Sequence, residues 1–306
     1  MDVFLNNEIN SVEYALFFIY FMKIGIAQAY NGEHRVYKKY AKELGVDAFW
    51  FDIDGANWLL NIKSADAYIW HADSKEENCR IIHDRVFFIE KIIGKKIYPD
   101  MNMYFAYGDK IKENDIFKYH RVPTPKTYVT FKKETALSII KKIKYPFVLK
   151  DAHGYGGWHV YKIKNQIEAR KFIEKIFSPK GLEHHNITMK DYFLAQEFVE
   201  GDKDLRVIII GNKVACAYWR EAEGDWKHNI DQGSRANFND IPKEALKICL
   251  DFNKKMKFHW MSYDLFVAKN GKVLMNEFSC NFAIKAPTAA GYEIRKMQVE
   301  YIKSKN

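Results

Sequence analysis

The segment Ser262–Ser279, SYDLFVAKNGKVLMNEFS, constrains the fold more than any other stretch of the chain. Two apolar runs flank Asn270-Gly271, a dipeptide that is the strongest short-range signal for a β-hairpin. If these two residues form the turn, Asp264 stands directly opposite Glu277, with Cβ atoms about 5 Å apart. Both carboxylates then lie among apolar neighbours, where an uncompensated charge is costly.

Two opposed carboxylates are stable when they share a proton or a cation. A hard divalent cation with oxygen ligands fits, and Mg²⁺ is the usual ion where phosphates are also bound, with Mn²⁺ as the alternative. Ser279 lies on the same strand face as Glu277 and could add a weak ligand. The alternative is a hairpin rim with both acids in water, but the apolar flanks favour the metal site.

The composition favours a globular protein with an anionic partner. The chain has 306 residues and a formal net charge of +9, but its lysines form no dense basic block. The charge suits nucleotides or acidic substrates, or serves solubility alone, and nucleic acid is not expected. None of the four cysteines lies in a C-x-x-C pair, which argues against a zinc site and predicts a reduced, cytoplasmic protein.

Residues 1–21 are expected to form an N-terminal extension. The apolar run Tyr14–Met22 is far shorter than the roughly 20 residues of a membrane span. It lacks the basic leader and the cleavage site of a signal peptide. We expect a terminal helix folded onto the protein, or a natural start at Met22, and no membrane span.

Strands alternate with helices over residues 22–108, which predicts a parallel α/β domain. No dinucleotide-binding fingerprint follows the first strand, so NAD binding is not expected. Trp70, His71 and Asp73 follow the third strand, where α/β sheets often bind ligands. A simple loop explains these three residues equally well.

The prolines of RVPTPKTYV (residues 121–129) mark a change of unit. Hairpins mixed with helices follow, so the C-terminal part is expected to be α+β. We divide it into a central unit, residues 109–185, and a C-terminal unit, residues 186–306. Gly211-Asn212 is a second expected hairpin turn.

Three further motifs point to phosphate or nucleotide binding. In YPFVLKDAHGYGGWHV, a strand ends at Lys150 and a glycine-rich loop follows, which can bring backbone N–H groups close to phosphate oxygens. The lysine precedes the glycines, so this is not a Walker loop, and a flexible hairpin loop is the alternative.

In LAQEFVEGDKDLRV, Gln196 and Glu197 interrupt an apolar strand, and Asp204 and Arg206 share one face of the next strand. These residues suit adenine and ribose, although Asp204 and Arg206 could equally form a structural ion pair. In WREAEGDWKHN the polar residues form either an anion-binding surface or a charged loop: Arg220, Lys227, His228 and Asn229.

The order of these motifs resembles the ATP-grasp superfamily, in the branch of the ribosomal-protein glutamate ligases and the lysine-biosynthesis ligases. The resemblance covers roughly Gly108–Asn281. It implies an ATP-grasp fold preceded by a parallel α/β domain, with ATP and Mg²⁺ bound.

The resemblance also assigns roles to residues of this chain. Lys110 and Lys150 would hold the α- and β-phosphates, the loop His153–His159 would close over them, and Arg220 would act with Lys150 at the transferred phosphoryl group. The implied nucleotide-binding residues are Lys110, Lys150, His153, Gly154, Tyr155, Gly156, Gly157, Gln196, Glu197, Phe198, Val199, Asp204, Arg206, Lys227, His228 and Asn229. The implied metal ligands are Asp264, Glu277, Ser279 and Asn281.

The chain departs from the family pattern at three points. His159 stands where the family usually has a glycine, and Ser279 stands where the family has the asparagine of Glu-x-Asn. The Pro-Gly that commonly follows is replaced by CNFAIK, beside the family's acceptor site. An unusual acceptor substrate is therefore expected.

The implied function is an ATP-dependent carboxylate–amine ligase that works through an acyl phosphate. Its partners would be a small-molecule, peptide or sugar carboxylate and an amine donor, and a homodimer or homotetramer is typical of the branch. A kinase with the same fold and a nucleotide-binding protein without catalysis are the rival interpretations. Nucleic-acid binding ranks last.

Overall fold

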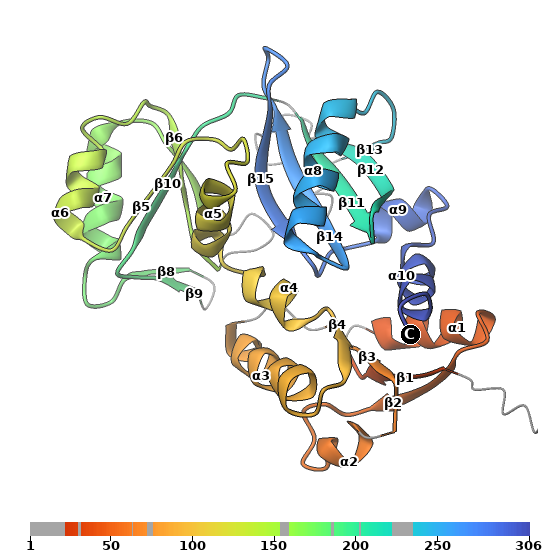
Figure 1. The fold of residues 1–306 in the computed structure, drawn as a ribbon. Helices are drawn as coiled ribbons and strands as arrows, with labels where there is room; N and C mark the ends of the chain where they lie inside the picture. The colour runs from red at the N-terminus through yellow and green to blue at the C-terminus, as the bar shows by residue number, and fades with distance from the viewer. Residues whose placement is uncertain are drawn as a thin grey trace, which may run out of the picture.

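The computed structural model describes residues 22–29, 32–62, 64–71, 76–153, 159–184, 187–201, 203–221 and 235–306. The expected extension 1–21, the loop residues Gly154–Gly157 and the segment Lys227–Asn229 lie outside the described residues, as does Asp73. The described chain forms three units, and the central and C-terminal units lie side by side above the N-terminal one (Figure 1).

The N-terminal unit is a parallel sheet, as the alternation of strands and helices predicted. Its strand order is β2-β1-β3-β4, and every neighbouring pair is parallel. The strands are β1 (Lys23–Ala27), β2 (Asp47–Phe51), β3 (Ala67–Ile69) and β4 (Lys96–Tyr98). The connecting helical segments are α1 (Glu33–Glu43), α2 (Trp58–Ile62), α3 (Glu76–Phe87), the π-helical η1 (Phe88–Ile92) and α4 (Met101–Ala106).

The central unit is an antiparallel sheet of order β5-β10-β6-β7 with its own apolar core. It follows helix α5 (Lys110–Tyr119). Its strands are β5 (Thr127–Thr130), β6 (Phe147–Lys150), β7 (Val160–Ile163) and β10 (Phe193–Glu197), joined by α6 (Lys133–Ile139) and α7 (Gln166–Ile176). A small ribbon of β8 (Leu182–His184) and β9 (Ile187–Met189) precedes β10.

The C-terminal unit is an antiparallel sheet of order β13-β12-β11-β14-β15. Its strands are β11 (Lys203–Ile210), β12 (Lys213–Glu221), β13 (Arg235–Asn237), β14 (Trp260–Val267) and β15 (Val273–Ser279). Its helices are α8 (Lys243–Met256), α9 (Lys285–Ala289) and α10 (Ile294–Lys303), and α10 packs against α1 of the N-terminal unit. The two-residue turn at Gly211-Asn212 is confirmed, because Ile210 pairs with Lys213.

The β14–β15 hairpin confirms the predicted pair but not the predicted turn. Asp264 does lie opposite Glu277. However, the N–H of Ala268 donates to Lys272 O (2.9 Å), so the loop has three residues, Lys269–Gly271, rather than two. A β-bulge at Asn276 adds one residue to β15 and restores the predicted register beyond it.

The division into units remains a proposal, and the sheets suggest one change to it. Because β10 pairs with β5 and β6, we propose that the central unit extends to Glu197 rather than ending at residue 185. The apolar core of the C-terminal unit is continuous with that of the N-terminal unit.

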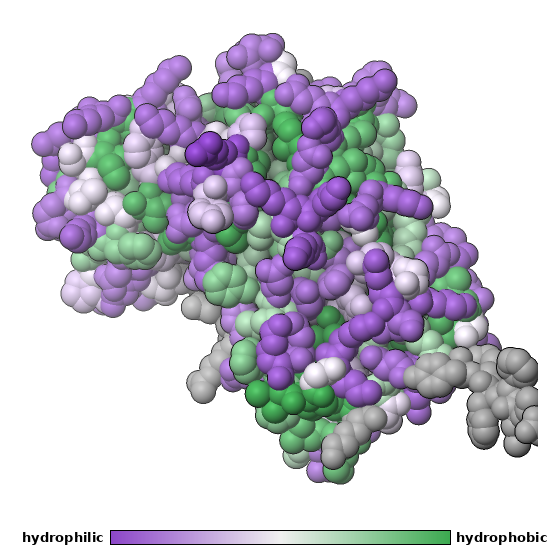
Figure 2. Space-filling view, viewed as in Figure 1, coloured by the Kyte–Doolittle hydropathy of each residue, from purple (hydrophilic) through white to green (hydrophobic). Residues whose placement is uncertain are grey.

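In the view of Figure 2, hydrophilic side chains are interspersed with apolar ones over the central and C-terminal units, and further apolar side chains gather at the lower end of the N-terminal unit. Within the described residues, no helix combines the length and the apolar character that a bilayer crossing requires.

Candidate active site

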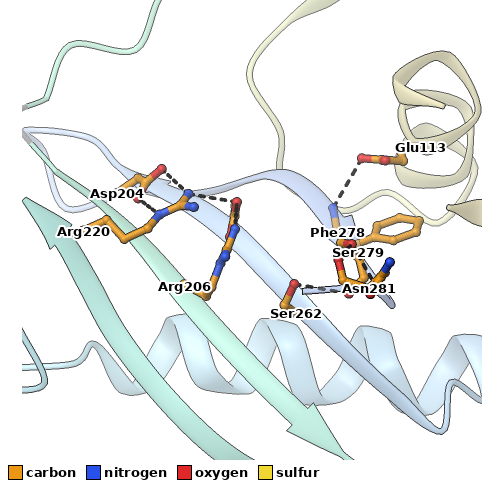
Figure 3. A network of polar contacts seen from close by, with 9 residues as sticks. Glu113, Asp204, Arg206, Arg220, Ser262, Phe278, Ser279 and Asn281 are labelled. Carbon is orange, nitrogen blue, oxygen red and sulfur yellow. Dashed lines mark hydrogen bonds and ion pairs between the residues drawn. The ribbon is translucent and has the colours of Figure 1, made fainter. Parts of the chain in front are cut away.

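Two aspartates and two arginines form a continuous chain of ion pairs on three neighbouring strands of the C-terminal sheet (Figure 3). Arg220 on β12 holds both oxygens of Asp204 on β11, from Nε (2.7 Å) and Nη2 (2.5 Å). Arg206 on β11 holds both oxygens of Asp264 on β14 at 2.8 Å. A second bond from Arg220 Nη2 to Asp264 Oδ2 (2.8 Å) joins the two pairs.

The strand register creates this network, since Asp204 lies opposite Arg220 and Arg206 lies opposite Asp264. The suggested ion pair between Asp204 and Arg206 is therefore wrong, because each residue pairs across the sheet instead of along its own strand.

The network is electrically balanced, and its charges decide the pKa values. Burial would raise the pKa of Asp264, but the guanidinium groups of Arg206 and Arg220 lower it well below its ordinary range. Burial raises the pKa of Asp204 despite the opposing charge of Arg220. Because Asp264 is compensated by arginines, it can stand opposite Glu277 without a bound ion.

Lys150 and the bulge of β15 form a second cluster. The Lys150 side chain is 8% exposed, and its Nζ donates to Asn276 Oδ1 at 2.8 Å. Burial lowers the pKa of Lys150 to about 8, against the attraction of Glu277 and with a further lowering from Lys110. Lys150 is thus a buried cation at neutral pH beside a second cation, Lys110, which suits a site for phosphate.

Lys110, Lys150 and Gln196 line one crevice between the central unit and the C-terminal sheet. Its volume is about 20 Å³, far below the roughly 300–1,000 Å³ of clefts that hold small-molecule ligands. A nucleotide can enter only after the two units move apart. The backbone N–H of Glu197 donates to Lys126 O (2.8 Å) and its side chain is exposed, so only Gln196 of this pair points a side chain into the crevice.

Phe198 and Val199 were also predicted to line the adenine site. The Lys162 ammonium lies over the Phe198 ring, 3.8 Å from its centre. Val199 is half-buried.

Glu113 on α5 belongs to this region and was missed from the sequence. It is 5% exposed, and its Oε2 accepts a hydrogen bond from the backbone N–H of Phe278 at 3.3 Å (Figure 3). Burial, and then the charge of Glu277, raise the pKa of Glu113 well above its ordinary value. The sequence does hold a signal that Glu113 is buried. Glu113 precedes Phe117 by four residues, so the two side chains share the buried face of α5.

The residues after Glu277 are arranged differently from the expected ligand set. The Ser279 hydroxyl donates to Asn281 O (2.5 Å) and accepts from the Asn281 N–H (3.2 Å). These local bonds compete with any role of Ser279 as a ligand. Phe278 points to the opposite side, against Phe117 and Phe252.

The ends of the predicted phosphate loop are fixed by hydrogen bonds. The His153 N–H donates to Asp151 Oδ1 (2.7 Å), and the Asp151 N–H donates to His159 O (3.0 Å). His159, in place of the expected glycine, is buried and has a φ of +53°, a value that glycine adopts more easily.

The residues at the end of β3 have local partners. The Tyr104 hydroxyl donates to Trp70 O (2.6 Å), and burial, with the positive charge of Arg295, lowers the pKa of His71. The hydrogen bond from Tyr104 gives the Trp70 backbone a structural partner, and the role of Trp70 and His71 in ligand binding stays a prediction.

The donor set fits one hard cation. Asp264 accepts three hydrogen bonds, and a carboxylate has about four acceptor positions, so one position is left beside the half-buried Glu277 opposite it. The described residues contain no group of three or more His, Cys, Asp or Glu side chains that could hold a metal by themselves. Phosphate oxygens or water would have to complete such a site.

The central antiparallel sheet faces a second sheet across a crevice with two lysines, and the β14–β15 hairpin carries paired carboxylates. This combination defines an ATP-grasp protein. Solved structures share this fold. The RimK domain protein ATP-grasp of Sphaerobacter thermophilus has a TM-score of 0.66 at 14% identity, over 92% of this chain and 99% of that chain. The D-alanine–D-alanine ligase of Bacillus anthracis has a TM-score of 0.66 at 16% identity, over 92% and 96%.

The chain matches the RimK-like ATP-grasp domain over residues 107–302 and belongs to that family. The α-aminoadipate–LysW ligase LysX of Saccharolobus solfataricus is 27% identical over 202 residues, 64% of this chain and 71% of the relative. A probable α-L-glutamate ligase of Vibrio atlanticus is 26% identical over 198 residues, 63% and 62%. These matches confirm the family and the class of carbon–nitrogen ligase expected from the sequence.

Proposed function

We propose that the protein joins a carboxylate to an amine through an acyl phosphate, with ATP bound in the crevice between β6, β10 and β15. The observation that carries the proposal is the convergence of Lys110, Lys150 and Gln196 on that crevice, beside the bulge that presents Glu277. Two lysines and a polar side chain in one narrow space suit phosphates and a base.

In the proposed reaction, the γ-phosphoryl group leaves ADP and forms a P–O bond to the substrate carboxylate. The amine then attacks the acyl carbon, loses a proton and expels phosphate. Lys150 stabilises negative charge on the phosphates because it is buried and cationic, and the closed crevice keeps water away from the acyl phosphate. Mg²⁺, held by Glu277 and Asp264, would neutralise charge on the phosphate oxygens.

Arg220 would orient Asp264 rather than contact the phosphoryl group, since both of its described partners are carboxylates. The roles of Lys227, His228 and Asn229 at the phosphates, of Asp204 at the ribose, and of Ser279 and Asn281 at the metal remain predictions from the family.

Amino acids occur in the names of both relatives, as α-aminoadipate and glutamate. We therefore propose an amino acid as one of the two substrates. The segment Cys280–Lys285, which replaces the family's Pro-Gly, supports a different second substrate.

ADP release, measured with Mg²⁺ over a panel of carboxylates and amines, tests the reaction. Hydroxylamine should intercept the acyl phosphate as a hydroxamate. Lys150→Ala and Glu277→Ala should each abolish ADP release, whereas Lys247→Ala, in an exposed pair with Asp251 on α8, should not. Turnover that survives in both site variants contradicts the proposal. ADP without hydroxamate, together with a phosphorylated acceptor, would instead identify a kinase.

A further inference from the structure

A basic groove lies between α1 and β2, on the N-terminal unit and outside the crevice described above. Its volume is about 520 Å³. One wall is the exposed face of α1, whose residues are spaced by three, four and seven positions and therefore point the same way. The cationic residues on this wall are Arg35, Lys38, Lys39 and Lys42.

The groove is strongly positive. Asp47 is the one acidic residue among its lining residues. Lys39 has a long contact of 3.8 Å with the exposed Glu43, while Arg35 and Lys42 form no ion pair with any described residue. Like charges at these helical spacings destabilise α1 slightly, and an anionic partner would relieve that repulsion.

The opposite wall is a free sheet edge. Among the described residues, no strand pairs with the outer side of β2. The Asp47 N–H donates to Met22 O on the side of β1, and Phe51 O accepts from Gln28 there. Successive residues of a strand direct their backbone N–H and C=O groups to opposite sides. Ala48 and Trp50 therefore direct these groups outward, into the groove.

Trp50 adds a fixed aromatic surface. Its side chain is 41% exposed, although large apolar side chains are usually buried. The Lys38 ammonium lies 4.5 Å from the centre of the Trp50 ring, and the His34 ring meets it edge-on at 5.1 Å. These contacts hold the indole in position before any partner arrives.

We propose that this groove binds an acidic, extended segment of a partner protein, which adds as a strand to β2. The outward backbone groups of Ala48 and Trp50 would pair with the segment, and its carboxylates would meet the cations of α1. β2 has five residues, which sets the length of the paired segment. A nucleic acid matches the charge but lacks backbone donors and acceptors at strand spacing.

The proposal goes beyond the ligase reaction and does not depend on it. The groove uses none of the residues that line the ATP crevice. It provides a place where a partner protein is held while chemistry takes place elsewhere on the molecule.

Binding of a fluorescein-labelled peptide with alternating Glu and Val to the full-length protein tests the proposal. A peptide of equal charge with Pro in place of each Val removes half of the backbone donors and should bind about tenfold more weakly, which is 1.4 kcal/mol. The double variant Lys38→Glu/Lys42→Glu should also lose about tenfold. A matched double reversal on α8, Lys247→Glu/Lys254→Glu, should bind normally.

Circular dichroism and ATP affinity of the α1 variant should be unchanged, so that lost binding cannot be ascribed to unfolding. Equal binding of the Val and Pro peptides would overturn strand addition, and so would binding of a DNA strand of equal charge at the same affinity. Absence of peptide binding would also overturn the proposal, while leaving the ligase reaction untouched.

Discussion

Raising the pH above about 8 should release ATP from the protein, because Lys150 loses its proton there. Burial is the main cause of this low pKa, and the charge of Glu277 only partly offsets it. With a pKa of about 8, roughly 90% of Lys150 is charged at pH 7 and about 10% at pH 9. The ATP affinity that depends on this cation should therefore fall about tenfold between the two pH values.

Isothermal titration calorimetry with ATP and Mg²⁺ from pH 6.5 to 9.5 measures this fall. Binding near pH 8 should take up a proton, because the phosphates raise the pKa of Lys150. The variant Lys150→Arg is the control, since a guanidinium stays charged throughout. A parallel loss of affinity in both proteins, or an unchanged affinity of the wild type at pH 9.5, would contradict this role of Lys150.

Deprotonation of Lys150 does not unfold the protein at high pH, so unfolding through Lys150 does not account for the expected loss of ATP affinity. The folded-state pKa of about 8 lies below the ordinary value of 10.5. Between these two values the unfolded chain binds more protons, so the contribution of Lys150 to stability rises with pH. Thermal melting at each pH should show no loss of stability that Lys150→Arg removes.

The other predictions concern the carboxylates and their partners. Glu277→Gln should lower ADP formation on the order of 100-fold with the fold intact, and unchanged turnover would exclude Glu277 from the site. Arg220→Ala leaves two buried carboxylates short of a partner and should cost about 3–5 kcal/mol in urea unfolding, whereas Lys247→Ala should leave the unfolding curve unchanged. Ser279→Asn supplies an amide oxygen and should lower the Mg²⁺ concentration needed for half-maximal ADP formation. An increase in that concentration would show that residue 279 is not a ligand.

The sequence predicted most of the fold because its strands and helices carry clear periodicity. The β14–β15 hairpin was predicted only in part. The opposition of Asp264 and Glu277 followed from an assumed two-residue turn, whereas the chain uses a three-residue loop and a bulge at Asn276 that together restore the same register. A bulge depends on how the strand packs, which local sequence does not reveal.

Charge partners were harder to predict than strands. Asp204 and Arg206 suggested a pair along one strand, but strand order decides their partners, and the placement of β14 beside β11 is a tertiary choice. Glu113 was overlooked for a similar reason. A glutamate on a lysine-rich helix reads as solvent-exposed, and only the packing of α5 against β15 buries it.

The aspartate–arginine network also has a consequence for biosynthesis. Asp264 follows Arg206 by 58 residues and Arg220 by 44 residues. During translation, the β11–β12 hairpin therefore emerges with Arg206 lacking its carboxylate and with the edge that β14 later covers still open. The C-terminal sheet can close only after β14 leaves the ribosome, so the interval between these two events is when the nascent chain most needs protection by a chaperone.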